Sequence, residues 1–98
     1  MLTAEALKQI YILANMKMRE FYEYFQLLNF PQEVRADCNS LTVINTGTAT
    51  AVLEGLEILP GQQYYAPGNE DEFNATRYRL SFTGGGNEIV TVIRKIYK

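Results

Sequence analysis

The feature that most constrains the fold is a run of short alternating segments with glycines at their corners. It covers residues 41–68, LTVINTGTATAVLEGLEILPGQQYYAPG. Gly47 and Gly55 stand at two corners, where glycine takes positive φ at no steric cost. At a third corner, Pro60-Gly61 fits the centre of a type II turn. The run therefore predicts an antiparallel meander of short strands.

The strand that opens this run has a period of two. In SLTVINT, residues 40–46, alternation predicts Leu41, Val43 and Asn45 on one face, with Thr42 and Ile44 on the other. ATAVLEG, LEIL and QQYY follow as three further short strands, and residues 66–75 read as a polar loop.

The last two strands are expected to form a hairpin. Residues 76–82, TRYRLSF, alternate cleanly, TGGGNE reads as a flexible tip, and IVTVIRKIY returns as the closing strand. In that hairpin Arg77 would lie opposite Arg94. Two like charges in that position are unfavourable unless an acidic group lies over them.

The N-terminal part reads differently, because its apolar residues recur every three or four positions. Residues 3–29 are expected to be an amphipathic helix that Pro31 stops. The aromatics of EFYEYF, residues 20–25, also suit a strand. The helix would either fold across its own sheet or overhang it and need a partner. Its apolar stripe is Leu7, Ile10, Tyr11, Ala14, Met18, Phe21, Phe25 and Leu28.

Together these patterns predict a mainly β fold: a small antiparallel β-sandwich or barrel of about six strands behind an N-terminal amphipathic α-helix. Residues 1–30 would be the helical segment and residues 31–98 the β domain, in one compact unit. The chain of 98 residues, 47% of them hydrophobic, suits a single domain.

Charge is distributed unevenly. The net charge is −2, which gives no reason to expect nucleic acid as a partner. Residues 36–76 contain six acidic and no basic side chains, a net −6, whereas residues 77–98 contain five basic and one acidic, a net +4. These segments would face each other within one fold or match between copies.

The sequence offers little for catalysis. It has no histidine, so Ser-His and Cys-His pairs and histidine-based zinc sites are excluded. Cys38, the one cysteine, cannot form an intrachain disulfide and reads as an inert, partly buried residue. Glu70, Asp71 and Glu72 lack the alternating ligand spacing of calcium loops. We therefore expect a protein that is not an enzyme and holds no metal or cofactor.

The sequence pattern also predicts neither a signal peptide nor a membrane span. Lys8, Gln9 and Asn15 interrupt the apolar residues at the N-terminus, unlike the core of a signal peptide. No apolar stretch approaches the length of a membrane span. We expect no membrane partner.

The pair Tyr64-Tyr65 is the sharpest local indication of a binding surface. Adjacent strand residues point to opposite faces, so only one of the two can belong to the core. The other would be exposed or in an interface, where tyrosine is favoured.

Two segments, LTVINTGTATAVLEGLEILPGQQYY and ATRYRLSFTGGGNEIVTVIRKIYK, resemble small β-rich virion proteins of tailed bacteriophages, particularly phages of Bacteroidetes hosts. The similarity lies within residues 41–98. It rests on a strand ending in Asn-x-Gly, a Gly corner, a Pro-Gly turn and a closing IRKIY-like strand. The resemblance implies a non-enzymatic structural role in capsid decoration, head-fibre attachment or portal and tail assembly.

We accordingly expect a virion subunit, assembled in the host cytoplasm, that contacts other virion proteins or copies of itself. The alternatives are a glycan-binding β module that uses Tyr64 or Tyr65 with Asn69 and the acidic loop, and a cellular protein-binding adaptor. The residues expected at the interface are Leu7, Ile10, Phe21, Phe25, Tyr64, Tyr65, Arg77, Arg79 and Arg94.

Overall fold

The computed structural model describes residues 19–98, which form eight β-strands and no helix. The strands are β1 (Phe21–Leu28), β2 (Gln32–Arg35), β3 (Ser40–Asn45), β4 (Thr50–Leu53), β5 (Leu56–Ile58), β6 (Gln63–Ala66), β7 (Arg77–Thr83) and β8 (Val90–Tyr97). The mainly β prediction is confirmed for this part of the chain, with eight strands instead of about six. No helix long and apolar enough to cross a membrane occurs within it.

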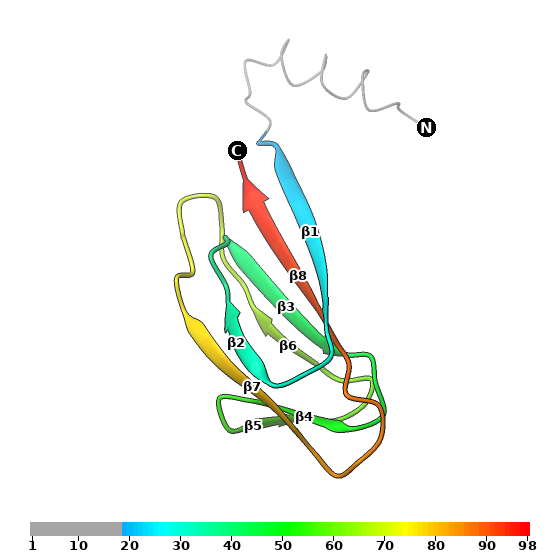
Figure 1. Ribbon diagram of the computed structural model, residues 1–98. Helices are drawn as coiled ribbons and strands as arrows, with labels where there is room; N and C mark the ends of the chain where they lie inside the picture. Colours follow the sequence, from blue (N-terminus) through cyan, green and yellow to red (C-terminus); the bar gives the residue numbers. More distant parts are fainter. Residues whose placement is uncertain (1–18) are drawn as a thin grey trace, which may run out of the picture.

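The strands form two antiparallel four-stranded sheets, sheet A with the order β1-β8-β3-β6 and sheet B with the order β2-β7-β4-β5. The first strand pairs with the last, the second with the seventh, the third with the sixth and the fourth with the fifth. The chain is thus one long hairpin rolled up on itself, which is the topology of a jelly roll. In Figure 1 the two sheets form two layers, and β1 and β8 extend beyond the other strands.

The core lies between the two sheets. Each central strand buries every second side chain, which is what half-buried strands require. On β3 Leu41, Val43 and Asn45 are buried on the core face, and Thr42 and Ile44 are half-buried on the other face, as predicted; Ser40, at the start of the strand, is also buried. Sheet B contributes its own inward residues to the same core. The largest fully buried side chains are Leu41, Leu80, Val34, Val43, Val90, Val92, Asn45 and Cys38.

The tight turns follow the sequence prediction at two corners and depart from it at a third. Gly55 and Gly61 have φ of 83° and 82°, the positive values that the predicted turns need. Gly47 does not have positive φ, so that part of the prediction is wrong. A Cβ on Gly47 would instead overlap the carbonyl oxygen of Asn87, so glycine is required there for close approach of two backbones.

The predicted helix is wrong for residues 19–29, because residues 21–28 form β1. Its residues 4–18 lie outside the described part of the chain. The aromatic, β-favouring composition of EFYEYF prevails over the three-to-four spacing. Phe21 and Phe25 lie on the same face whether the segment is a helix or a strand. Residues four apart are neighbours on a helix, and on a strand residues an even number of positions apart point to the same side. Leu28, assigned to the same stripe, is buried on the opposite face.

Of the predicted meander, only the hairpin of β4 and β5 around Gly55 is confirmed, and the predicted closing hairpin is wrong. β3 lies between β8 and β6, and β7 and β8 belong to different sheets. The glycine-rich segment between β7 and β8 is therefore a crossover from sheet B to sheet A. Arg77 lies opposite Arg35 on β2, not opposite Arg94. The Glu33 carboxylate lies 3.1 Å from Arg35 Nε and 3.7 Å from Arg77 Nε, which offsets the repulsion between these like charges.

The ion pairs do not join the acidic segment to the basic one. The pairs among residues 19–98 are Arg19–Glu70, Arg35–Glu33 and Arg77–Glu33. Each partner is about half exposed, so each pair contributes little to stability. Glu54, in the acidic segment, accepts a hydrogen bond from the backbone N–H of Arg79 at 2.7 Å. The two segments are joined by the β3–β8 and β4–β7 pairings and not by ion pairs.

Candidate functional site: the outer face of sheet A

The outer face of sheet A carries several exposed apolar side chains from neighbouring strands. One row of paired residues crosses all four strands: Phe25, Ile93, Thr42 and Tyr65. The next row, one pleat further along, is Leu27, Thr91, Ile44 and Gln63. Phe25 is 68% exposed, Leu27 64% and Tyr65 56%. We call these two rows the apolar rows.

The apolar rows meet a small charged region towards the ends of β1 and β8. Glu23 is paired with Lys95, and Phe21 with Tyr97. The Lys95 ammonium lies 4.1 Å from the centre of the Phe21 ring and 5.1 Å from that of Tyr97. Phe21 and Tyr97 also pack edge to face at 5.9 Å. These cation–π and aromatic contacts hold the side chains in fixed positions.

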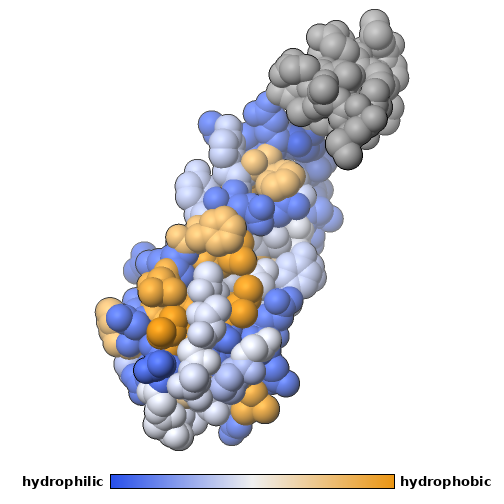
Figure 2. Space-filling view, turned by 90° about the vertical axis from the view of Figure 1, so that its right-hand side faces the viewer, coloured by the Kyte–Doolittle hydropathy of each residue, from blue (hydrophilic) through white to orange (hydrophobic). Residues whose placement is uncertain are grey.

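The strand β1 contributes the most exposed part of this surface. Seven of its eight residues are exposed, and only Leu28 is buried. Figure 2 shows the side of the molecule that faces right in Figure 1, where β1 lies, and hydrophobic side chains gather in the middle of that side. Large exposed apolar patches on a soluble domain mark interaction surfaces more often than they occur by chance.

Tyr64 and Tyr65 point to opposite faces of sheet A, as adjacent residues of a strand do. Tyr64 faces inward, is half-buried, and packs edge to face on Tyr78 with ring centres 5.7 Å apart. Tyr65 faces outward and ends the first apolar row. Of the two tyrosines, Tyr65 is therefore the one presented on the outer face.

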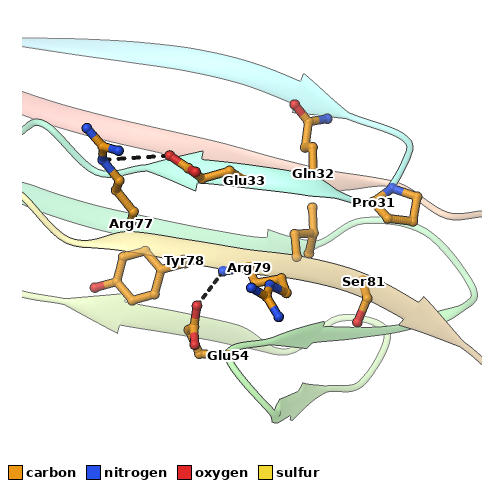
Figure 3. A pocket seen from close by; sticks show the side chains of 9 residues that line it. Pro31, Gln32, Glu33, Glu54, Arg77, Tyr78, Arg79 and Ser81 are labelled. Atoms are coloured by element: carbon orange, nitrogen blue, oxygen red, sulfur yellow. Dashed lines mark hydrogen bonds and ion pairs between the residues drawn. The ribbon is translucent and has the colours of Figure 1, made fainter.

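The outer face of sheet B is polar and carries an open groove of about 420 Å³ between β2 and β7. Figure 3 shows Glu33 directed to Arg77, and Glu54 directed to the backbone of Arg79. Among residues 19–98, the Arg79 guanidinium has no partner. The groove thus offers exposed arginines but no buried polar group that would fix a ligand.

The residues predicted for the interface therefore separate into several places. Phe21, Phe25 and Tyr65 lie together on the outer face of sheet A. Arg77 and Arg79 lie on the opposite side of the molecule, in the sheet B groove. Leu7 and Ile10 lie outside the described residues.

Arg94 faces the inside of sheet A and has a structural role. Its Nε donates to the carbonyl oxygens of Arg35 and Ala36 at 2.9 and 3.1 Å, and its Nη1 donates to Gln26 Oε1 at 2.8 Å. These bonds tie β8 and β1 to the end of β2. Charge-assisted bonds of this kind are among the stronger ones in proteins.

Residues that could support chemistry lie apart from each other. Cys38 is fully buried, and that burial raises the pKa of its thiol. A raised pKa means less of the reactive thiolate at neutral pH. In the acidic loop, Glu72 Oε1 accepts from the backbone N–H of Asn69. Nowhere in the described part of the chain do three Cys, Asp or Glu side chains form a group that could hold a metal ion.

Sequence reasoning missed Leu27, Ile93 and Ile44, which complete the apolar rows. Leu27 was assigned to no face because a helical period was applied to it. Ile44 was correctly placed opposite the core residues of its strand. One signal in the sequence could have indicated this surface. Several strands have an apolar residue on the side opposite their core residues, whereas a solvated sheet face is normally polar.

Comparisons with known proteins do not identify a family: no protein-family model, curated protein or solved structure matches this chain.

Proposed function

We propose that the protein is a non-enzymatic assembly subunit that works through protein–protein contacts, with the apolar rows of sheet A as its contact surface. The observation that carries the proposal is the exposure of Phe25, Leu27 and Tyr65 on one continuous sheet face. Leaving such side chains in water forgoes about 1.5–3 kcal/mol for each large apolar group. A partner that covers them recovers that free energy.

The contrast between the two sheets supports the same surface. The outer face of sheet B carries Arg35, Arg77, Arg79 and Glu33, as a solvated face normally does. The outer face of sheet A carries one acidic and one basic residue, Glu23 and Lys95, beside its apolar rows. Depletion of charge at the centre of a patch, with aromatic residues in it, is the composition of an interface core.

The proposal includes the phage virion as the setting, assembled in the host cytoplasm. The resemblance of residues 41–98 to small virion proteins suggests it, and the jelly-roll topology is one that viral capsid proteins use. Fold alone does not establish function, since lectins and cupins share this architecture. The setting therefore needs a test of its own.

The test is incorporation into particles. Particles purified from a culture that produces the protein should contain it at a copy number comparable to other structural subunits, measured by quantitative mass spectrometry. The double variant Phe25→Glu with Tyr65→Glu should reduce incorporation by at least about tenfold, because both ends of an apolar row become charged.

A matched control is Thr83→Glu, which places the same charge at an exposed position on β7 in sheet B, opposite Thr50. It should enter particles normally. Circular dichroism should show unchanged strand content in both variants. Absence of the native protein from particles would contradict the virion setting, and normal incorporation of the double variant would contradict the assignment of this face.

A glycan-binding module remains the second candidate, because Tyr65 is exposed and lectins use jelly rolls. The two candidates differ at Phe25. Glycan binding centred on Tyr65 and Asn69 would be lost in Tyr65→Ala and kept in Phe25→Ala. Assembly through the apolar rows would be weakened by either substitution. Titration with oligosaccharides and the particle test separate the two outcomes.

A further inference from the structure

We infer that β1 pairs edge to edge with β1 of a second copy, related by a two-fold axis, so that two sheets A join into one eight-stranded sheet. The inference rests on the proposed function and names the partner and the mode of contact. It concerns the backbone edge of sheet A, whereas the apolar rows are a surface formed by side chains.

The edge itself is the first observation. β1 is the terminal strand of sheet A, and among residues 19–98 it pairs with β8 alone. The Lys98 N–H donates to the carbonyl oxygen of Glu20, so the even-numbered residues of β1 direct their backbone groups to β8. The alternation of an antiparallel ladder then directs the N–H and C=O groups of Phe21, Glu23, Phe25 and Leu27 to the open edge.

The other three edges of the molecule are protected. β2 and β6 are four residues long and β5 is three. Short edge strands, charged side chains, proline and bulges are the devices that prevent edge-to-edge association. β1 has eight residues with a continuous register, no lysine, arginine or proline, and seven exposed side chains. It is therefore the edge on which another strand would add.

The sequence of β1 is suited to pairing with itself. A two-fold axis makes the two strands antiparallel, and a register centred on Tyr24 pairs residues 21–27: Phe21 with Leu27 and Glu23 with Phe25 of the other copy. This register satisfies the open-edge groups of both strands and keeps the two Glu23 carboxylates from lying opposite each other. It also places both sets of apolar rows on the same side of the joined sheet.

Exposed apolar side chains flank the open edge of β1 and would pack against those of the second copy. Phe21, Tyr22, Tyr24, Phe25 and Leu27 are 40–68% exposed. At about 100 Å² of exposed surface for each such side chain, two copies present about 1,000 Å² on the two faces of the joined strands, of which edge pairing covers the part that flanks the edge. The backbone hydrogen bonds add to this area.

A disulfide between copies tests the register. At the two-fold axis Tyr24 would face Tyr24 of the other copy as a non-hydrogen-bonded pair, with Cα atoms about 4.5 Å apart. That separation suits a disulfide. Tyr24→Cys should form a covalent dimer under mild oxidation, whereas Tyr22→Cys should not, because its two copies would be about 13 Å apart. The native Cys38 is buried and should not compete.

A proline substitution tests the edge. Glu23→Pro removes an N–H that points to the open edge, without removing a bond to β8, and proline is tolerated on such edges. Glu23→Thr removes the same charge but keeps the N–H. We expect the threonine variant to have the native mass of a dimer and the proline variant that of a monomer, by light scattering on a sizing column.

These results separate the inference from the proposed function. A native chain that is monomeric at the highest concentration at which it stays soluble, or Tyr24→Cys without a covalent dimer, would overturn the inference. If that monomer still enters particles, the proposed function stands. A cross-linked dimer that never enters particles would support edge pairing and contradict the virion setting. Should Glu23→Pro fail to fold, the cysteine pair decides the question.

Discussion

Asn45 illustrates how a single buried side chain fixes the connections of this small fold. Its Nδ2 donates to the carbonyl oxygens of Ala49 and Ile58 at 2.7 and 2.8 Å, and its Oδ1 accepts from the N–H of Gly47 at 3.0 Å. The side chain is 1% exposed, so these bonds are shielded from bulk water. It therefore joins the end of β3 to the start of β4 and the end of β5.

Replacing Asn45 with alanine should be strongly destabilising. It leaves two buried carbonyl oxygens and one N–H without their partner, and each buried unsatisfied group costs roughly 1–3 kcal/mol. Because the groups can partly rearrange, we expect the free energy of unfolding to fall by about 2–4 kcal/mol. Urea denaturation followed by circular dichroism measures it. Asn87→Ala, at an exposed position, should change stability by less than about 0.5 kcal/mol. A loss as small for Asn45→Ala would contradict the account.

Gly47 and Gly55 are required for different reasons, which a pair of substitutions can separate. Gly55 has positive φ, and a Cβ there would meet no atom within 4 Å. Gly55→Ala should cost about 1–2 kcal/mol, and Gly55→Asn less, since asparagine adopts this conformation more readily. At Gly47 a side chain would overlap the backbone of Asn87 and Ile89. Alanine and asparagine should therefore both destabilise it by about 3 kcal/mol or more.

Thermal denaturation of these four variants provides the measurement. If asparagine is less destabilising than alanine at Gly55 but not at Gly47, backbone conformation is the constraint at Gly55 and space is the constraint at Gly47. Equal effects of asparagine at both positions would show that one of the two explanations is wrong.

At the level of elements, the strands of residues 40–66 were predictable because apolar and polar residues alternate in them with a period of two, which fits a strand and not a helix. β3 has a core side and an outward side in the sequence itself, and the turns around Gly55 and Gly61 have the residues that their geometry demands. β1 was not predictable in the same way. FYEYFQLL has apolar residues on both faces, so its pattern does not select between helix and strand.

The outer-face site was only partly predictable for a related reason. Phe21, Phe25 and Tyr65 were chosen from a helical stripe and a tyrosine pair. Pairing brings two of them, Phe25 and Tyr65, into one row across four strands. Which strands become neighbours depends on how the long hairpin rolls up, and local residue patterns do not encode that. The same uncertainty led to the wrong partner for Arg77.

At the level of the whole molecule, the rolled hairpin explains why an edge such as β1 is exposed. The jelly roll pairs its first strand with its last, so the strand next to the N-terminal segment must lie at the rim of sheet A. The pairing of β8 with β3 ends at Lys95, opposite Ser40, but β8 continues to Tyr97 and β1 accompanies it to that residue. The two strands project as a ribbon whose edge and faces are accessible (Figure 1).

The unequal charge of the two halves of the chain gives a final prediction about association. If copies associate through β1 edges and apolar side chains, the native mass should be the same at low ionic strength and at about 1 M salt, where the Debye length is about 3 Å. Hydrophobic contacts and backbone hydrogen bonds are little affected by screening, whereas attraction between the −6 and +4 segments would be lost. Arg79→Gln, in the sheet B groove, should leave the mass unchanged in both conditions. An oligomer that dissociates in high salt would instead assign the contact to those charged segments, and the β1 edge would then be a surface free for a different strand.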